Sequence, residues 1–179
     1  MDEPSSSLFE TPRLRLLPIN EQDAPLLLEI WNDPTFIHYV SDRGIRTVEQ
    51  ARQAIVEGPL NLYDVYGYGP YRMVRKSDAA SVGICGLFRR EFLDEPDLGY
   101  AVLPGFRGDG FASEAARQVL VIAGVVFGLK RIKALISPAN ARSIQVVERL
   151  GFRLERRCSI DVDDDTLLYD FEFSDVGGS

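Results

Sequence analysis

The sequence is poor in the residues that build metal centres and disulfide frameworks. It has one histidine, His38, and two cysteines, Cys85 and Cys158, which do not form a C-x-x-C pair. Zinc sites need several such side chains at short spacing, and disulfide scaffolds need many cysteines. We therefore expect no metal ion and two free thiols, as in an intracellular protein.

Long apolar runs and an excess of positive charge are also missing. The longest apolar run, residues 119–129, falls short of the ~18 apolar residues of a membrane span. The first ten residues are acidic and lack the apolar core of a signal peptide. The formal net charge is −7, which argues against a broad nucleic-acid surface. These absences predict a cytoplasmic protein with no membrane or nucleic-acid partner.

The chain of 179 residues suits one domain with a full-sized core. No repeat, low-complexity tract or linker rich in Pro, Gly or Ser divides it. We predict a single domain over residues 8–175, with flexible ends at 1–7 and 176–179.

Apolar periodicity and capping residues predict a mixed α/β fold of about seven strands and four helices. Strands are expected over residues 13–19, 71–76, 81–92, 97–103, 131–137, 152–162 and 166–173. Helices are expected after Asn20 or Asp23, over 47–58, after the glycines that precede Phe111, and over 140–151. Residues 61–71, with four tyrosines and two glycines, are expected to form a loop. This order predicts a mixed sheet rather than a doubly wound parallel one.

The stretch PGFRGDGFASEA, residues 104–115, places three glycines directly before an alanine-rich helical pattern. Gly108 and Gly110 lack the Cβ atoms that would block a ligand, and the first N–H groups of a helix have no intrahelical partner. Arg107 adds a charge that pairs well with phosphate. The stretch is therefore either a phosphate-binding turn or a tight turn whose glycines serve only chain geometry.

Two common phosphate ligands fit the stretch poorly. A P-loop needs a lysine at the start of the helix, whereas Gly110 is followed by Phe111 and Ala112. A dinucleotide site needs a third glycine, where this chain has Ser113, and a carboxylate about 20 residues later. No Asp or Glu occurs from Ala115 to Val147. ATP, GTP and NAD are therefore disfavoured.

A third pattern does match. Arg107, Gly110 and Ala112 fit R-x-x-G-x-A between a strand and a helix, which resembles the acyl-CoA loop of the GCN5-related N-acetyltransferase (GNAT) superfamily. Residues 140–152, NARSIQVVERLGF, resemble the N-x-x-S…E-x-L-G-F block of the branch that includes the ribosomal-protein N-terminal (RimJ/RimL-type) acetyltransferases. The opening ETPRLRLLPI and the central DLGYAVLPGFRGDGFASEA are similar to that branch as well. The resemblance spans nearly the whole chain.

The resemblance implies an acetyl-CoA-dependent N-acetyltransferase with a GNAT-like fold. Two strands, here residues 97–103 and 131–137, splay apart and leave a cleft for the pantetheine arm. Val102 and Leu103 would lend it backbone groups, and Asn140 and Ser143 would face the thiol. A backbone N–H of Tyr100 or Ala101 would bind the oxyanion. The turn around the pyrophosphate would consist of Arg107, Gly108, Asp109, Gly110, Phe111, Ala112 and Ser113.

The resemblance also implies which side chains take part in the acetyl transfer. Many members of the superfamily use a tyrosine to protonate the leaving thiolate, and this chain has Val147 at that position. In the ribosomal-type branch a serine is thought to serve, and Ser143 occupies its place. Asp97 and Glu155 are the candidates for the general base, and water can also relay the proton. These residues also have simpler interpretations. Ser143 would be a capping residue, and Asp97 and Glu155 would be solvent-facing carboxylates.

The sequence does not name the amine acceptor. In the family, the N-terminal helical segment and the loop after it shape the acceptor pocket, which gives Trp31, His38, Tyr39 and Tyr66 as candidates. Core packing explains such aromatic residues equally well. A non-catalytic acyl-CoA-binding module and a nucleotide-binding protein are the alternative functions. The family also often forms homodimers through the strands after Phe152.

Overall fold

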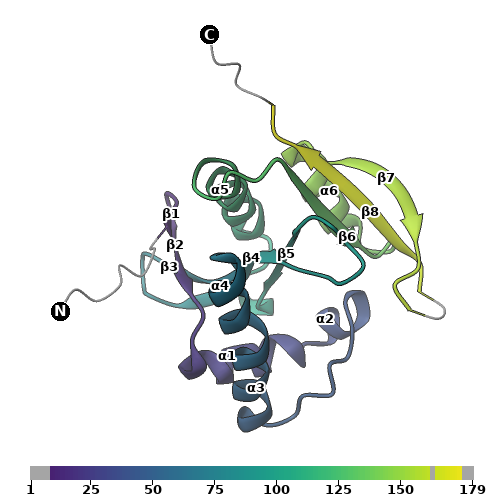
Figure 1. The fold of residues 1–179 in the computed structure, drawn as a ribbon. Helices are drawn as coiled ribbons and strands as arrows, with labels where there is room; N and C mark the ends of the chain where they lie inside the picture. The colour runs from purple at the N-terminus through teal and green to yellow at the C-terminus, as the bar shows by residue number, and fades with distance from the viewer. Residues whose placement is uncertain (1–8, 162–163, 175–179) are drawn as a thin grey trace.

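The computed structural model describes residues 9–161 and 164–174 (Figure 1). The predicted flexible ends, 1–7 and 176–179, lie outside these residues. Eight strands form one sheet in the order β1-β2-β3-β4-β5-β6-β8-β7. The strands are β1 (Phe9–Glu10), β2 (Leu14–Pro18), β3 (Pro70–Arg75), β4 (Ser81–Phe88), β5 (Asp97–Val102), β6 (Arg131–Ile136), β7 (Arg153–Cys158) and β8 (Thr166–Glu172). The α-helices of this part of the chain are α1 (Ala24–Trp31), α2 (Pro34–Tyr39), α3 (Val48–Ile55), α4 (Asn61–Tyr66), α5 (Phe111–Val125) and α6 (Ala141–Leu150).

The predicted mixed sheet is confirmed. Neighbouring strands pair antiparallel, except that β5 and β6 run parallel. Helix α5 makes the crossover between them, as parallel neighbours require. Figure 1 shows β5 and β6 moving apart along their length.

Each face of the sheet is covered by its own helices. Helices α5 and α6 pack on one face, where Ala115, Val119 and Val147 join a core with strand residues such as Cys85 and Ile132. Helices α1 and α3 pack on the other face through a second core that includes Leu27 and Ile55. Ile84 of β4 and Leu103, which follows β5, belong to this second core. Strand β4 is therefore buried on both sides, whereas the second half of β5 is only partly buried.

The predictions were least accurate in the N-terminal helical segment. Residues 61–66, predicted as a loop, form α4, which ends at Gly67 with φ +77°. The glycine ends a helix here, whereas the tyrosines do not break it. Helix α2 was also missed, although Asp33 caps it and Pro34 opens it, which is a recognised helix start. His38 therefore lies on a helix and not in a loop.

Three further features of the described residues concern membrane spans, metal ligands and thiols. None of its helices is long and apolar enough to cross a membrane. Within the same residues, no three His, Cys, Asp or Glu side chains group closely enough to hold a metal ion. Cys85 is buried, Cys158 is half-buried, and both are free thiols.

Candidate active site

A cavity of about 780 Å³ lies beside the second half of β5, and its wall also includes residues of α2, of the start of α5 and of α6. Strands β5 and β6 share one register pair, Asp97 with Lys133, and none of the later residues described in β5 is paired with β6. The volume lies in the range of small-molecule sites. Its wall includes twelve of the thirteen predicted cofactor-binding residues: Tyr100, Ala101, Val102, Leu103, Arg107, Gly108, Gly110, Phe111, Ala112, Ser113, Asn140 and Ser143. Asp109 is not part of this wall.

The glycine-rich turn has the backbone conformation that an anion site needs. Gly108 and Gly110 adopt φ values of +87° and +81°, which L side chains rarely adopt. Gly110 is the N-cap of α5 and has no side chain to bond the first N–H groups of that helix. These N–H groups, at the positive end of the helix dipole, are therefore available to a ligand at the cavity wall.

A cluster around Glu114 fixes this turn to the segment between β1 and β2. Arg13 Nε lies 2.7 Å from Glu114 Oε2, and Arg13 Nη2 donates to the carbonyl oxygen of Asp109 at 2.8 Å. Thr11 Oγ1 donates to Glu114 Oε1 at 2.6 Å. The contacts hold the turn from its outer side. Sequence patterns did not reveal this role of Arg13, since its partner lies 101 positions away.

The guanidinium of Arg107 is occupied by other parts of the protein. It donates to Asp33 Oδ2 at 2.5 Å, to Thr35 Oγ1 at 3.1 Å and to the carbonyl oxygen of Val102 at 2.9 Å. Asp33 also caps α2. Arg107 thus joins the glycine-rich turn, strand β5 and helix α2. A direct contact between Arg107 and phosphate stays a prediction.

Hydrogen bonding along β5 selects which backbone groups face the gap beside β6. The N–H of Leu103 donates to Val82 at 2.9 Å, and its carbonyl oxygen accepts from Phe106 at 3.0 Å, so both are used. Because hydrogen-bonding direction alternates along an antiparallel strand, Ala101 also faces β4. The N–H groups of Tyr100 and Val102 then face the opposite side, toward β6. Of the two predicted oxyanion donors, Tyr100 is in the better position.

Helix α6 brings Asn140 and Ser143 to the cavity. The Asn140 side chain caps the helix by accepting from the backbone N–H of Ser143 at 3.2 Å. The cap therefore uses the Ser143 backbone and leaves its hydroxyl for other contacts. Val147 is 1% exposed in the core, at the position where many superfamily members have a tyrosine.

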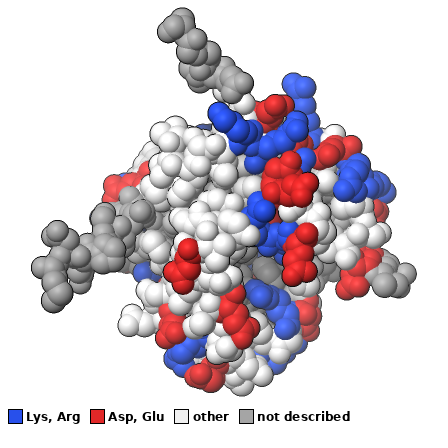
Figure 2. All heavy atoms as spheres, viewed as in Figure 1, with Lys and Arg blue, Asp and Glu red and all other residues white. Residues whose placement is uncertain are grey.

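The two predicted base candidates lie near the point where the strands separate but are not part of the cavity wall. Asp97 is 2% exposed and lies 3.2 Å from Arg90 Nε. Burial raises the pKa of Asp97, and Arg90 offsets this only in part. Glu155 on β7 lies 2.7 Å from the ammonium of Lys133, which also pairs with Asp170. Figure 2 shows the two signs of charge side by side over β6, β7 and β8.

The acceptor candidates occupy different places. Tyr39 of α2 is part of the cavity wall, together with Phe36 and Val40. Trp31 is buried and stacks on Arg43, Tyr66 stacks on Tyr68, and His38 packs edge-on against Tyr39. The structure therefore brings Tyr39 to the cavity and leaves the other three candidates outside its wall.

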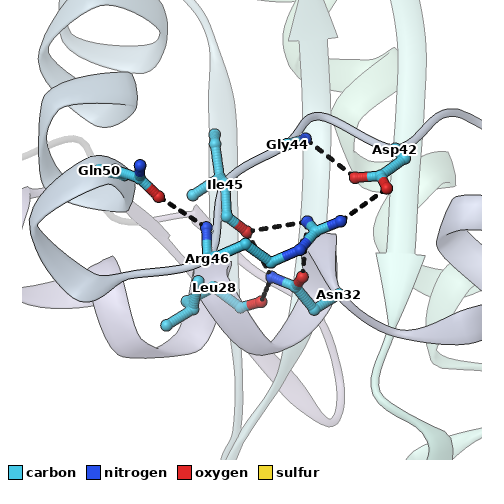
Figure 3. A network of polar contacts seen from close by, with 7 residues as sticks. All are labelled: Leu28, Asn32, Asp42, Gly44, Ile45, Arg46 and Gln50. Carbon is cyan, nitrogen blue, oxygen red and sulfur yellow. Dashed lines mark hydrogen bonds and ion pairs between the residues drawn. The ribbon is translucent and has the colours of Figure 1, made fainter.

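A polar network holds the segment that follows α2. Arg46 donates to Asn32 Oδ1 at 2.9 Å and to Asp42 at 2.6 Å, and its backbone N–H donates to Gln50 (Figure 3). Asn32 in turn donates to the carbonyl oxygen of Ile45 at 2.8 Å. The network ties the ends of α1 and α3 together below α2, which supports the helical side of the cavity.

The chain is similar to known acetyltransferases over most of its length. Residues 13–153 match the family described as "Acetyltransferase (GNAT) domain". A curated relative, the uncharacterized N-acetyltransferase p20 of Bacillus licheniformis, is 29% identical over 156 residues, which cover 81% of this chain and 82% of the relative.

Solved structures show the same fold. A putative GNAT-family acetyltransferase from Bordetella pertussis is 27% identical with a TM-score of 0.78, covering 92% of this chain and 98% of that one. RimL, a ribosomal L7/L12 α-N-protein acetyltransferase in complex with coenzyme A, has a TM-score of 0.77 at 16% identity, covering 93% and 98%. The predicted fold is thereby confirmed. With the family match extending from residue 13 to residue 153, this chain belongs to the GNAT acetyltransferase family.

Proposed function

We propose that this protein transfers the acetyl group of acetyl-CoA to a primary amine by direct attack within a ternary complex. The observation that carries the proposal is the cavity beside β5, whose wall combines the glycine turn before α5 with Asn140 and Ser143 at the start of α6. RimL, which shares the fold, was solved with coenzyme A. In the proposal, the N–H groups at the start of α5 bind the pyrophosphate and the Val102 N–H binds the pantetheine arm.

The reaction begins with loss of a proton from the amine. An alkylammonium has a pKa of about 10 and is not a nucleophile until it is deprotonated. We propose that a water molecule passes this proton to Asp97, since the buried carboxyl is a stronger base than an exposed one. Both carboxylates are ion-paired, Asp97 with Arg90 and Glu155 with Lys133. Glu155 is the weaker candidate because its side chain is half exposed, whereas that of Asp97 is buried.

The amine nitrogen then bonds to the acetyl carbon, and negative charge develops on the carbonyl oxygen. The N–H of Tyr100 is the proposed donor to this oxyanion. When the C–S bond breaks, both electrons stay on sulfur. The proposed hydrogen-bond donor to the thiolate is the Ser143 hydroxyl, since Val147 offers none.

Calorimetric titration with acetyl-CoA tests the proposal first, with ATP and NADH as controls. We expect acetyl-CoA alone to bind with a stoichiometry near one. A panel of acceptors then follows, consisting of a peptide N-terminus, an amino acid, a polyamine and an aminoglycoside. We expect turnover with at least one of these amines. Selective binding without turnover would instead support the acyl-CoA-binding module, and binding of ATP or NADH would overturn the assignment.

Replacing Asp97 by asparagine is expected to lower kcat by about ten- to a hundredfold near neutral pH, as loss of a general base does. The same change is expected to stabilise the fold. Below the unfolded pKa of about 3.9, both states hold the proton. As the pH rises through the higher folded pKa, the folded wild type carries a buried charge that asparagine avoids.

Urea denaturation at neutral pH and at about pH 3 measures the difference in stability between wild type and Asp97→Asn. This difference should disappear at the lower pH. Glu155→Gln serves as the comparison and is expected to reduce kcat less. An Asp97→Asn variant with full activity would show that the carboxyl is only structural.

The proposal includes the cytoplasm as the place of action. Free thiols such as Cys85 and Cys158 stay reduced there, and acetyl-CoA is a metabolite of that compartment.

A homodimer through β7, which carries the exposed side chain of Leu154, is part of the same proposal and is tested by light scattering.

A further inference from the structure

Tyr100 carries a polar group that the proposed mechanism does not yet use. Its backbone lies on β5, and its ring packs against the core beneath α5 and α6. The hydroxyl oxygen is buried and has no hydrogen-bond partner among the described residues. Burying a hydroxyl without a hydrogen-bond partner costs free energy. A native protein that keeps such a hydroxyl therefore has a use for it, or its hydrogen-bond partner arrives with a ligand.

Ser143 is the polar side chain that lies beside this hydroxyl. Burial raises the pKa of Tyr100 to about 12, and the neighbouring Ser143 hydroxyl lowers it only in part. Tyr100 therefore keeps its proton at neutral pH and can only donate or accept as a neutral phenol. Both residues are part of the wall of the same cavity. The Ser143 hydroxyl is near enough to lower the pKa of Tyr100 through a hydrogen bond to it, but the contact lacks the geometry of an ordinary hydrogen bond.

The local structure indicates which hydroxyl of this pair needs to be oriented by the other. The Ser143 backbone N–H is held by Asn140, which fixes the first turn of α6 while the hydroxyl remains free to rotate. Tyr100 comes from β5, where it lies opposite the buried Cys85 of β4. A serine O–H that rotates freely about the Cβ–Oγ bond is a poorly oriented donor. A second hydroxyl that donates to the serine oxygen would orient it.

We propose that Tyr100 is a positioning residue for Ser143, donating its phenol O–H to the Ser143 hydroxyl oxygen so that the Ser143 O–H points at the sulfur of bound acetyl-CoA. The inference rests on the proposed acetyl transfer. In the step itself, the nitrogen of the neutral amine bonds to the acetyl carbon, the C–S bond breaks with both electrons on sulfur, and the second proton of the amine goes to solvent water, since Asp97 already holds the first. The oriented serine stabilises the thiolate, and Tyr100 keeps its own proton.

The test uses CoA, the product, so that it needs no amine. The thiol pKa of bound CoA is measured from thiolate absorbance against pH, after subtraction of the protein alone. We expect Ser143→Ala to raise this pKa by about one unit, as loss of a hydrogen bond to a charged group does, and Tyr100→Phe to raise it by roughly half as much. In the double variant, Tyr100→Phe should add nothing to Ser143→Ala.

Tyr169→Phe is the matched control. Tyr169 is also a buried tyrosine, but its hydroxyl donates to Glu148 outside the cavity. We expect this control to leave the thiol pKa unchanged. With an accepted amine, Tyr100→Phe should lower kcat about five- to tenfold, while calorimetry shows the Kd for acetyl-CoA within about twofold of wild type.

The outcomes separate the two proposals. A wild-type protein that does not bind CoA would overturn the proposed function and this inference together. Binding with a thiol pKa unaltered by Tyr100→Phe would overturn the inference alone. An effect of Tyr100→Phe that persists in the Ser143→Ala background would show that Tyr100 acts on sulfur directly and not through Ser143, which also overturns it.

Discussion

Replacing Gly110 by valine is expected to weaken acetyl-CoA binding by about a hundredfold or more, which is roughly 2.7 kcal/mol of binding free energy. Gly110 has φ +81°, and a β-branched residue in that conformation is strained. The nearest protein atom to an added Cβ is Arg13 Nη2 at 3.6 Å, so the protein itself has room for it. The loss comes from a turn that can no longer present the first N–H groups of α5 to phosphate.

Gly105→Ala is the matched control in the same turn. Gly105 has no left-handed φ, and an added Cβ would meet no atom within 4 Å. It is also outside the cavity wall. Calorimetry should find its affinity for acetyl-CoA within about twofold of wild type. If Gly110→Val bound acetyl-CoA as tightly as this control, the phosphate-binding role of the turn would be wrong.

The second large effect is expected at Gly83 of β4, where alanine should lower the free energy of unfolding by about 3 kcal/mol. Alanine in a strand normally gains about 0.5–1 kcal/mol over glycine. Here an added Cβ would lie 2.1 Å from the carbonyl oxygen of Ala101 and 2.9 Å from Val102 Cα. Both contacts are with backbone, so β4 and β5 must move apart.

Urea denaturation measures this loss, and calorimetry measures its effect on the site. Because Ala101 and Val102 are part of the cavity wall, a shift of β5 should weaken acetyl-CoA binding as well. Gly99→Ala is the comparison, since its Cβ would meet the ring of Phe88 at 2.9 Å, which can rotate away. Equal stability of the Gly83→Ala and Gly99→Ala variants would contradict the predicted backbone clash.

The sequence predicted the parts of the fold whose signals are local. Thr47 caps α3, Asn140 caps α6 and Gly151 ends it, because capping depends on residues within one turn. Strands β3 to β6 followed from apolar runs between turn residues. Residues 61–66 were misread because their tyrosines resemble a loop composition, while α4 depends on contacts with distant residues. Tyr63, for example, accepts from the N–H of Ile19 at 2.9 Å.

The sequence by itself determined where the glycine-rich turn before α5 lies and that Asn140 and Ser143 begin a helix. Left-handed glycines and helix caps are properties of a few consecutive residues. Only the tertiary structure decided what surrounds them. Arg107 meets Asp33 across 74 positions and Arg13 meets Glu114 across 101, while Tyr100 of a strand and Ser143 of a helix line the same cavity. Such contacts depend on how the sheet divides and how the helices pack on it, and no local pattern encodes them.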